Sequence, residues 1–257
     1  MDRRDYLAAG AGVGVAALGG CSFLAAAETP PPAVPRQRLD EGEWVQTGET
    51  SGTVLERSYG PVTLEAVSHA LRYVDQGLQT QVADRTLGQI ATALAVFFAS
   101  RVDFSPDLDN LPGGVGQEEI VDQVRASSRE QFEQQLRDQG LTDIEKRGEG
   151  TLDIDTGETA ETVEMTAIYP FEGIEFPVTE DERVTIPAAD IEVSALLAVW
   201  HHGDFVLISG GAFPAQNFAT TVEDDLSEGI TVSVDVDLGL TPAAYGEEIR
   251  GLVAGVE

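Results

Sequence analysis

Cysteine and lysine are nearly missing from this chain of 257 residues, because each occurs once, as Cys21 and Lys146. A single thiol excludes an intramolecular disulfide and a multi-cysteine metal site, since both need at least two cysteines. The shortage of lysine belongs to a wider shortage of positive charge: 15 Lys and Arg face 45 Asp and Glu, and the net charge is −30. A nucleic-acid backbone needs a basic surface, so we expect no nucleic-acid partner.

Recognisable catalytic motifs are missing as well. The sequence contains no G-x-S-x-G elbow, and Ser209 in "LISGGAF" lacks the first glycine of that pattern. No phosphate-binding loop and no dinucleotide fingerprint occurs. We therefore expect a protein without a cofactor, and we predict that it is not an enzyme.

A long apolar run is absent, but a short one lies near the N-terminus. Residues 6–18 are uncharged and, at roughly 13 residues, shorter than the about 20 that a helix needs to span a bilayer. Arg3 and Arg4 precede this run and are followed by Tyr6 and Leu7, a pattern typical of the twin-arginine (Tat) export signal. The general secretory route is the alternative. Residues 1–20 are predicted to be a signal peptide.

The single cysteine stands directly behind this signal. Leu18, Gly19, Gly20 and Cys21 form a lipobox, in which the cysteine receives a lipid on its sulfur and becomes the first residue of the mature protein. The alternative is a small apolar cysteine at the end of an ordinary signal peptide. Two lipid chains hold a protein on a membrane firmly. We therefore expect the protein to be lipid-anchored at Cys21, on the extracytoplasmic face of the cell membrane.

The acidic composition predicts a protein adapted to concentrated salt. A net charge of −30 is self-repelling in dilute buffer, whereas at about 1 M salt the Debye length falls to roughly 3 Å and the repulsion is screened. An acidic composition can also indicate disorder. Here 42% of the residues are hydrophobic and the carboxylates are interspersed with them, which favours a folded domain in a haloarchaeal protein.

The mature chain divides into a linker and one domain. Residues 21–42 hold the lipidated cysteine and a Pro-rich linker, and residues 43–257 are predicted to form a single extracytoplasmic domain. Residues 43–74 are expected to form two or three strands broken at Gly48, Gly52 and Gly60, and the apolar run 90–100 a central strand. Residues 103–114 are expected to form a loop.

The remaining pattern predicts strands and two helices. Strands are expected at residues 143–154, 161–172, 190–202, 204–214 and 230–238, with a hairpin turn at His202 and Gly203. The clearest helix covers 117–139, and a second begins at Pro242 behind the N-cap Thr241. This order predicts an α+β domain, an antiparallel β-sheet with one internal and one C-terminal helix packed on one face.

Three histidines are the candidates for catalysis or metal binding: His69, His201 and His202. Neighbouring residues of a strand point to opposite faces, so His201 and His202 do not easily share a metal. The stretch "DIDTGE", residues 153–158, is similar to the start of a calcium loop, but its glycine comes one place early and the closing Glu at the twelfth position, which would be Glu164, falls within a predicted strand. A metal site is therefore not predicted.

Several stretches together resemble an uncharacterised family of haloarchaeal lipid-anchored proteins. The likeness lies in the twin-arginine lipobox, in "VQTGETSGTVLERSYGPVTLEAVSHALRYV", in "LAVFFASRVDF" with the loop and helix that follow, and in "VSALLAVWHHGDFVLISGGAFP". The chain departs from the family around residues 172–190 and 219–240. The resemblance implies location and general fold, and no catalytic residue.

These observations predict a lipid-anchored surface protein that serves as a non-enzymatic binding or envelope accessory module. Its partners would be the membrane, through the lipid on Cys21, and either a small hydrophobic ligand held between sheet and helices or an envelope protein. The alternative is a membrane-tethered hydrolase that uses histidine and carboxylate chemistry. That alternative requires His69, a second histidine and several acids to converge in one pocket.

Overall fold

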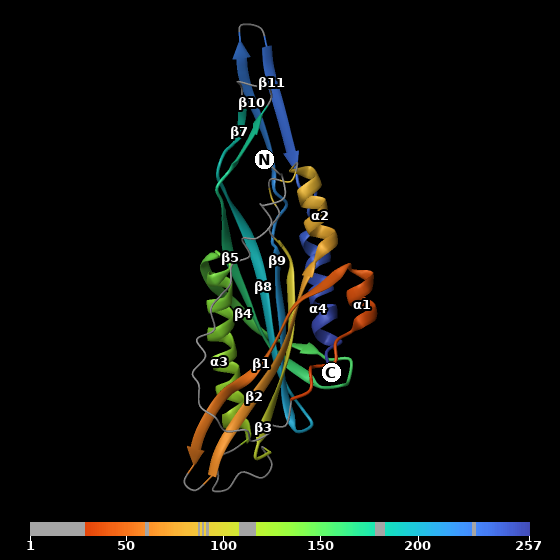
Figure 1. The fold of residues 1–257 in the computed structure, drawn as a ribbon, viewed down its shortest axis with the longest axis vertical. Helices are drawn as coiled ribbons and strands as arrows, with labels where there is room; N and C mark the ends of the chain where they lie inside the picture. Colours follow the sequence, from red (N-terminus) through yellow and green to blue (C-terminus); the bar gives the residue numbers. More distant parts are fainter. Residues whose placement is uncertain are drawn as a thin grey trace, which may run out of the picture.

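The computed structural model describes residues 29–59, 62–86, 88, 90, 93–107, 117–177, 183–227 and 230–257. It confirms the α+β class, because a large antiparallel sheet is combined with internal and C-terminal helices. The molecule is elongated, and the long strands run along its length (Figure 1). The predicted signal and lipobox residues Arg3, Arg4, Leu18, Gly19, Gly20 and Cys21 lie outside the described residues.

The core of the fold is a seven-stranded sheet with the strand order β1-β2-β3-β9-β8-β5-β4, in which all neighbours are antiparallel. Its strands are β1 (Trp44–Tyr59), β2 (Val62–Asp75), β3 (Val96–Ser105), β4 (Thr142–Asp153), β5 (Thr159–Phe171), β8 (Ala189–His202) and β9 (Phe205–Pro214). The predicted hairpin between the last two is confirmed, and Gly203 adopts the positive φ of 58° that the turn requires.

Two short hairpins lie outside this sheet. β6 (Ile174–Pro177) pairs with β7 (Arg183–Ile186), and β10 (Ala219–Ser227) pairs with β11 (Ile230–Asp237). The second hairpin extends from one end of the molecule, opposite the end reached by the β1–β2 hairpin (Figure 1). These hairpins occupy the stretches around residues 172–190 and 219–240, in which we expect the chain to depart from the family that it resembles.

In the described part of the chain, four helices cover the sheet, and they do so on both of its faces. α3 (Gln117–Asp138) lies on one side, whereas α1 (Arg36–Glu41), α2 (Gln76–Arg85) and α4 (Pro242–Ala254) lie on the other (Figure 1). The prediction that the internal and C-terminal helices share one face is therefore wrong in this detail. The result is a three-layer arrangement with the sheet in the middle.

The reason is visible in β8, where both faces of the strand are apolar. Leu196, Ala198 and Trp200 pack in the core below α4, whereas Leu197 and Val199 pack in the core below α3. A strand that is covered on one face alternates apolar and polar residues, but a strand buried on both faces reads as a continuous apolar run. The run "ALLAVW" already carries this signal.

Other boundaries also differ from the sequence prediction. β1 runs unbroken past Gly48 and Gly52. Its register shifts beside Gly48 and again between Thr53 and Leu55, whereas Gly52 stays paired with Ser68. β3 starts at Val96 and continues to Ser105, through the first residues of the predicted loop. α1 lies inside the segment predicted as an extended linker, and α2 occupies a stretch for which the sequence pattern predicts no element.

The two ends of the described chain pair with each other. The amide of Ala33 donates to the carbonyl of Glu257, and the amide of Glu257 donates back to Ala33, at 2.7 and 2.8 Å. Arg38 in α1 donates to the carbonyl of Gly251 in α4 and forms an ion pair with Asp155. The beginning of the domain is thus docked beside α4 and does not hang free.

Asp75 connects β2 to α2 and provides a test of the packing on this side. Its carboxylate accepts a hydrogen bond from the amide of Leu78 at 2.7 Å as the N-cap of α2, and the residue is only 5% exposed. Burial raises the pKa of Asp75, and the negative charges of Glu248 and Glu43 add to the rise, whereas the amide hydrogen bond opposes it. The ionised carboxylate is therefore less stable in the folded than in the unfolded chain.

Replacement of Asp75 by Asn is expected to stabilise the protein at neutral pH, because Asn keeps the N-cap acceptor and removes the buried charge. The raised pKa means that Asp75 favours the folded state below its unfolded pKa of about 4, and that this contribution is lost as the pH rises through the folded value. The free energy of unfolding of D75N should therefore increase relative to that of wild type as the pH rises from the unfolded to the folded pKa of Asp75. Asp75→Ala removes the charge as well as the cap, so it should be about 1 kcal/mol less stable than D75N. Denaturant unfolding from pH 4 to 7 measures both effects, and a D75N protein less stable than wild type at pH 7 would contradict this explanation.

Candidate functional site

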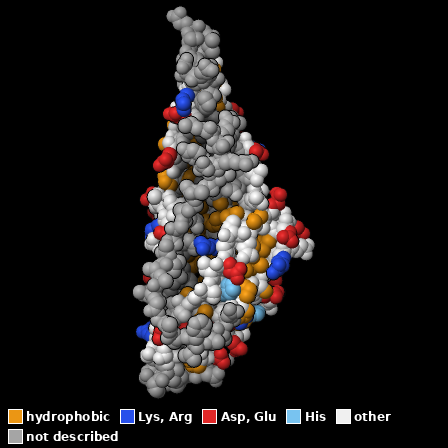
Figure 2. Space-filling view, in the orientation of Figure 1, with side chains coloured by type: hydrophobic (Ala, Val, Ile, Leu, Met, Phe, Trp, Pro, Cys, Tyr) orange, Lys and Arg blue, Asp and Glu red, His pale blue; other side chains and the backbone are white. Residues whose placement is uncertain are grey.

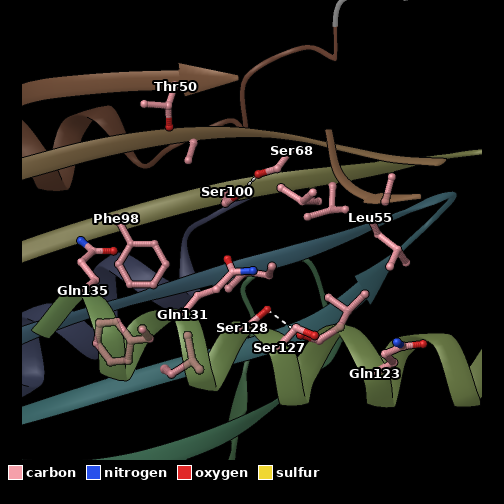
Figure 3. Close-up of a pocket in the computed structure, with 18 residues that line it drawn as sticks. Thr50, Leu55, Ser68, Phe98, Ser100, Gln123, Ser127, Ser128, Gln131 and Gln135 are labelled. Carbon is pink, nitrogen blue, oxygen red and sulfur yellow. Dashed lines mark hydrogen bonds between the residues drawn. The ribbon is translucent and has the colours of Figure 1, made fainter. Parts of the chain in front are cut away.

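A cavity of about 270 Å³ lies between α3 and the sheet. One wall comes from β1, β2 and β3, the opposite wall from α3, and the floor from β8 and β9, so that the side chains of the strands and of the helix face one another (Figure 3). We call this cavity the α3 groove. It is lined by Thr50, Val54, Leu55, Ala66, Ser68, Ala70, Phe98, Ser100, Val102, Gln123, Val124, Ser127, Ser128, Gln131, Phe132, Gln135, Leu197 and Ile208.

The helix contributes a stripe of uncharged polar side chains to the groove. Gln123, Ser127, Gln131 and Gln135 are spaced four residues apart, so they lie one above the other along α3. Figure 3 shows these side chains on the groove side of the helix. They provide amide and hydroxyl groups that can both donate and accept hydrogen bonds.

The sheet contributes the hydroxyls of Thr50, Ser68 and Ser100 above an apolar floor. The Ser68 and Ser100 side chains hydrogen-bond each other at 2.8 Å across β2 and β3. Around them the lining is apolar, with Val102, Leu197 and Ile208 among its residues. At the far end of β1, Arg57 donates to the Gln123 side chain at 2.8 Å and ties the β1–β2 hairpin to α3.

The α3 groove is electrically neutral in a strongly acidic protein. None of the 18 described residues that line it is charged, whereas the chain holds 45 Asp and Glu. Charged side chains of α3 form ion pairs with residues that do not line the groove. Arg125 pairs with Asp122 and with Glu161, and Arg137 pairs with Glu133. Figure 2 shows acidic side chains along both margins of the molecule, with hydrophobic side chains gathered between them. A neutral groove favours an uncharged ligand, because a charge left unpaired in a partly buried site is costly.

The three histidines do not reach this groove. Nδ1 of His69 lies 2.8 Å from the carbonyl oxygen of Thr29, and Nε2 lies 2.7 Å from a carboxylate oxygen of Glu49. Nδ1 of His202 lies 2.7 Å from Oε1 of Glu158. Both side chains are on the α4 face of the sheet, whereas His201 points to the opposite face from His202.

His69 and His202 are separated by a structural pair on the same face. Arg101, directly opposite His69 in the neighbouring strand, binds Asp103 through two nitrogens and lies 3.7 Å above the ring of Phe205. The ring of His202 packs against the same Phe205 ring, and the two ring centroids are 5.2 Å apart. Each histidine therefore contacts its own carboxylate, and the two do not share one.

The calcium-like stretch at residues 153–158 forms the turn between β4 and β5. Asp155 pairs with Arg38, and Glu158 accepts from the hydroxyl of Thr156 and lies beside His202. The hydrogen bond from Thr156, and after it the contact with His202, lower the pKa of Glu158. Within the part of the chain that the structure describes, no group of three His, Cys, Asp or Glu is placed to hold a metal ion.

Ser209, the one serine weighed as a nucleophile, has a structural role. It is fully buried, and its hydroxyl donates to the carbonyl of Phe98 at 2.8 Å, which links β9 to β3. Among the described residues, no helix combines the length and the apolar character needed to cross a bilayer.

The fold and groove define the class of the protein: an α+β domain whose antiparallel sheet is covered on both faces, with an uncharged cavity under one helix. Residues 31–257 match the family model described as a domain of unknown function (DUF6517), and the chain belongs to this family. Comparison with curated proteins and with solved structures gives no match. The membership agrees with the resemblance to an uncharacterised family.

Proposed function

We propose that this protein is a membrane-tethered, non-enzymatic binding module, and that the α3 groove holds its ligand, an uncharged amphiphilic molecule. The observation that carries the proposal is the neutrality of the groove in a chain of net charge −30. Ligand sites are typically apolar cavities in which a few polar groups fix orientation. The α3 groove has this composition, because hydroxyls and amides line an otherwise apolar space.

The tether is the second part of the proposal. The twin arginines Arg3 and Arg4, the short apolar run and the lipobox ending in Cys21 support export through Tat and lipidation of the cysteine. The acidic, lysine-poor composition supports a haloarchaeal origin. Such a protein would display the groove outside the cell, close to the lipid surface.

The chemistry of the groove favours binding over hydrolysis. A serine becomes a nucleophile when a neighbouring base accepts its proton. Ser68 and Ser100 hydrogen-bond each other, and the described lining of the groove contains no His, Asp, Glu or Lys to act as that base. A membrane-tethered hydrolase would need a histidine beside a serine of the groove, and His69 and His202 contact carboxylates on the other face of the sheet.

The experiment is a titration of the full-length Cys21→Ser protein, in molar salt, with three amphiphiles that share an octyl chain. We expect octylglycerol, which is neutral, to bind in a saturable manner, and octanoate and octylammonium to bind at least about tenfold more weakly, because each would leave a charge unpaired in the groove. Tighter binding of either ion than of octylglycerol would contradict the proposed ligand class. Absence of saturable binding by all three would contradict the proposed function.

A further inference from the structure

A second cavity, of about 320 Å³, lies on the same face of the sheet as the α3 groove. Its described lining is mostly apolar, and Gln139 and Tyr169 are the lining residues that carry a polar side-chain group. We call it the tail cavity. It is lined by Ala93, Leu94, Val96, Gln139, Leu141, Tyr169, Ile191, Val193, Ala212 and Pro214.

The two cavities follow each other along the same elements. On β3, Phe98 lines the α3 groove and Val96, the next residue on that face, lines the tail cavity. Along the helix, Gln135 lines the first, and Gln139, four residues later, lines the second. The tail cavity therefore lies next to the groove, beyond the C-terminal end of α3.

A pair of aromatic rings stands between them. The Phe98 and Phe132 centroids are 5.4 Å apart and the rings are tilted by 44°, so that the sheet and α3 touch at this point. Phe132 is 4% exposed and held in the core, whereas Phe98 is only partly buried. Beneath Phe98 lies Gly210, where an added Cβ would come 3.1 Å from the Phe98 ring, so the ring occupies space that a side chain would fill.

We infer that the ligand is an uncharged lipid with a single long chain, whose head group lies in the α3 groove and whose chain passes Phe98 into the tail cavity. This inference rests on the proposed function and adds to it the length of the chain and the residue that controls its passage. The groove supplies hydroxyls and amides for a hydroxylated or ether head group, and the tail cavity supplies mainly apolar surface. Phe98 is half-buried and belongs to the sheet, whereas Phe132 is held in the core. The Phe98 ring is therefore the one that moves aside to let the lipid chain pass.

The test compares octylglycerol with dodecylglycerol on the full-length Cys21→Ser protein in molar salt. Each methylene that enters the tail cavity should raise the affinity about fourfold, so dodecylglycerol should bind far more tightly than octylglycerol. Gln139→Trp places an indole at the edge of the tail cavity and should remove most of this gain. Gln134→Trp is the matched control, because Gln134 is exposed on α3, hydrogen-bonds Asp138 and lines neither cavity. In Gln134→Trp, the increase in affinity from octylglycerol to dodecylglycerol should equal that in wild type.

A second variant tests the ring directly. Phe98→Ala should speed the association of dodecylglycerol several-fold relative to that of octylglycerol, because the shorter chain has little need to pass the ring. An equal gain from octyl to dodecyl in wild type and in Gln139→Trp would overturn the inference. Saturable binding of octylglycerol in that same experiment would leave the proposed function standing, whereas no binding of either compound would refute the proposed function itself.

Discussion

The melting temperature of the folded protein should rise steeply, by roughly 10 °C or more, between dilute buffer and about 1 M salt. The chain carries three times as many carboxylates as basic groups, 45 against 15, so one-to-one pairing can neutralise at most a third of them. The surplus carboxylates repel one another, and folding brings them closer together. At about 1 M salt the Debye length of roughly 3 Å screens this repulsion.

Salt also weakens attractive pairs, but this opposing effect is small. The ion pairs of Arg38 with Asp155 and of Arg250 with Glu164 are about half exposed, and exposed pairs contribute about 0–1 kcal/mol each. The repulsion that comes from a net charge of −30 outweighs them. Calorimetry in sodium chloride, with sucrose as a non-ionic control, measures the effect. A melting temperature that does not change with salt would contradict the halophilic interpretation of the sequence.

The second large effect is the release of the protein from membranes when Cys21 is replaced by Ser. The wild-type protein should sediment almost entirely with the membrane fraction, and Cys21→Ser should leave most of it in the soluble or secreted fraction. Two lipid chains hold a protein on a membrane firmly, and Cys21→Ser removes the sulfur that would carry them. Ser22→Ala is the matched control, since it leaves the lipobox cysteine intact.

Intact mass spectrometry of the same fractions locates the anchor. The membrane-bound wild-type chain is expected to begin at Cys21 and to carry the added mass of a lipid. Unchanged membrane association of the Cys21→Ser protein would contradict lipid anchoring at this position. A native chain that begins upstream of Cys21 with a free thiol would contradict both cleavage and lipidation.

The parts of the fold that sequence patterns predict well are those in which one local signal is strong. α3 is predicted because Ile120, Phe132 and Leu136 recur at helical spacing, and these three residues are buried against the sheet. The β8–β9 hairpin follows from two apolar runs joined at Gly203, which can take a positive φ. In both cases a local pattern and the tertiary environment agree.

The missed elements lack such a signal. α2 has few apolar residues and is held in place by the Asp75 cap and by burial of Leu78 and Val82, which are contacts with the rest of the fold. In β1 the glycines look like strand breaks, but pairing with β2 over the full length absorbs the irregularity as bulges. The division of helices between the two faces of the sheet depends on how distant segments come together, although the apolar run of β8 already indicates it.

The sequence predicts a type of ligand for the candidate site and does not predict its residues. The sequence leads to a hydrophobic ligand between sheet and helices, but it does not identify the residues of the α3 groove. The stripe of Gln123, Ser127, Gln131 and Gln135 is a usable signal, because these four uncharged polar residues share one side of a helix otherwise rich in charges. The sheet side of the groove joins β1 to β9, which are distant in the sequence, and no local pattern indicates that contact.

The most direct test of the central claim is the affinity for octylglycerol of two variants that differ only in where the same substitution stands on α3. Gln131→Trp fills the α3 groove and is expected to reduce the affinity at least tenfold, whereas Gln134→Trp, on the exposed side of the helix, should bind like wild type. Circular dichroism confirms that both variants are folded. Equal binding by the two folded variants would show that the ligand does not lie in the groove.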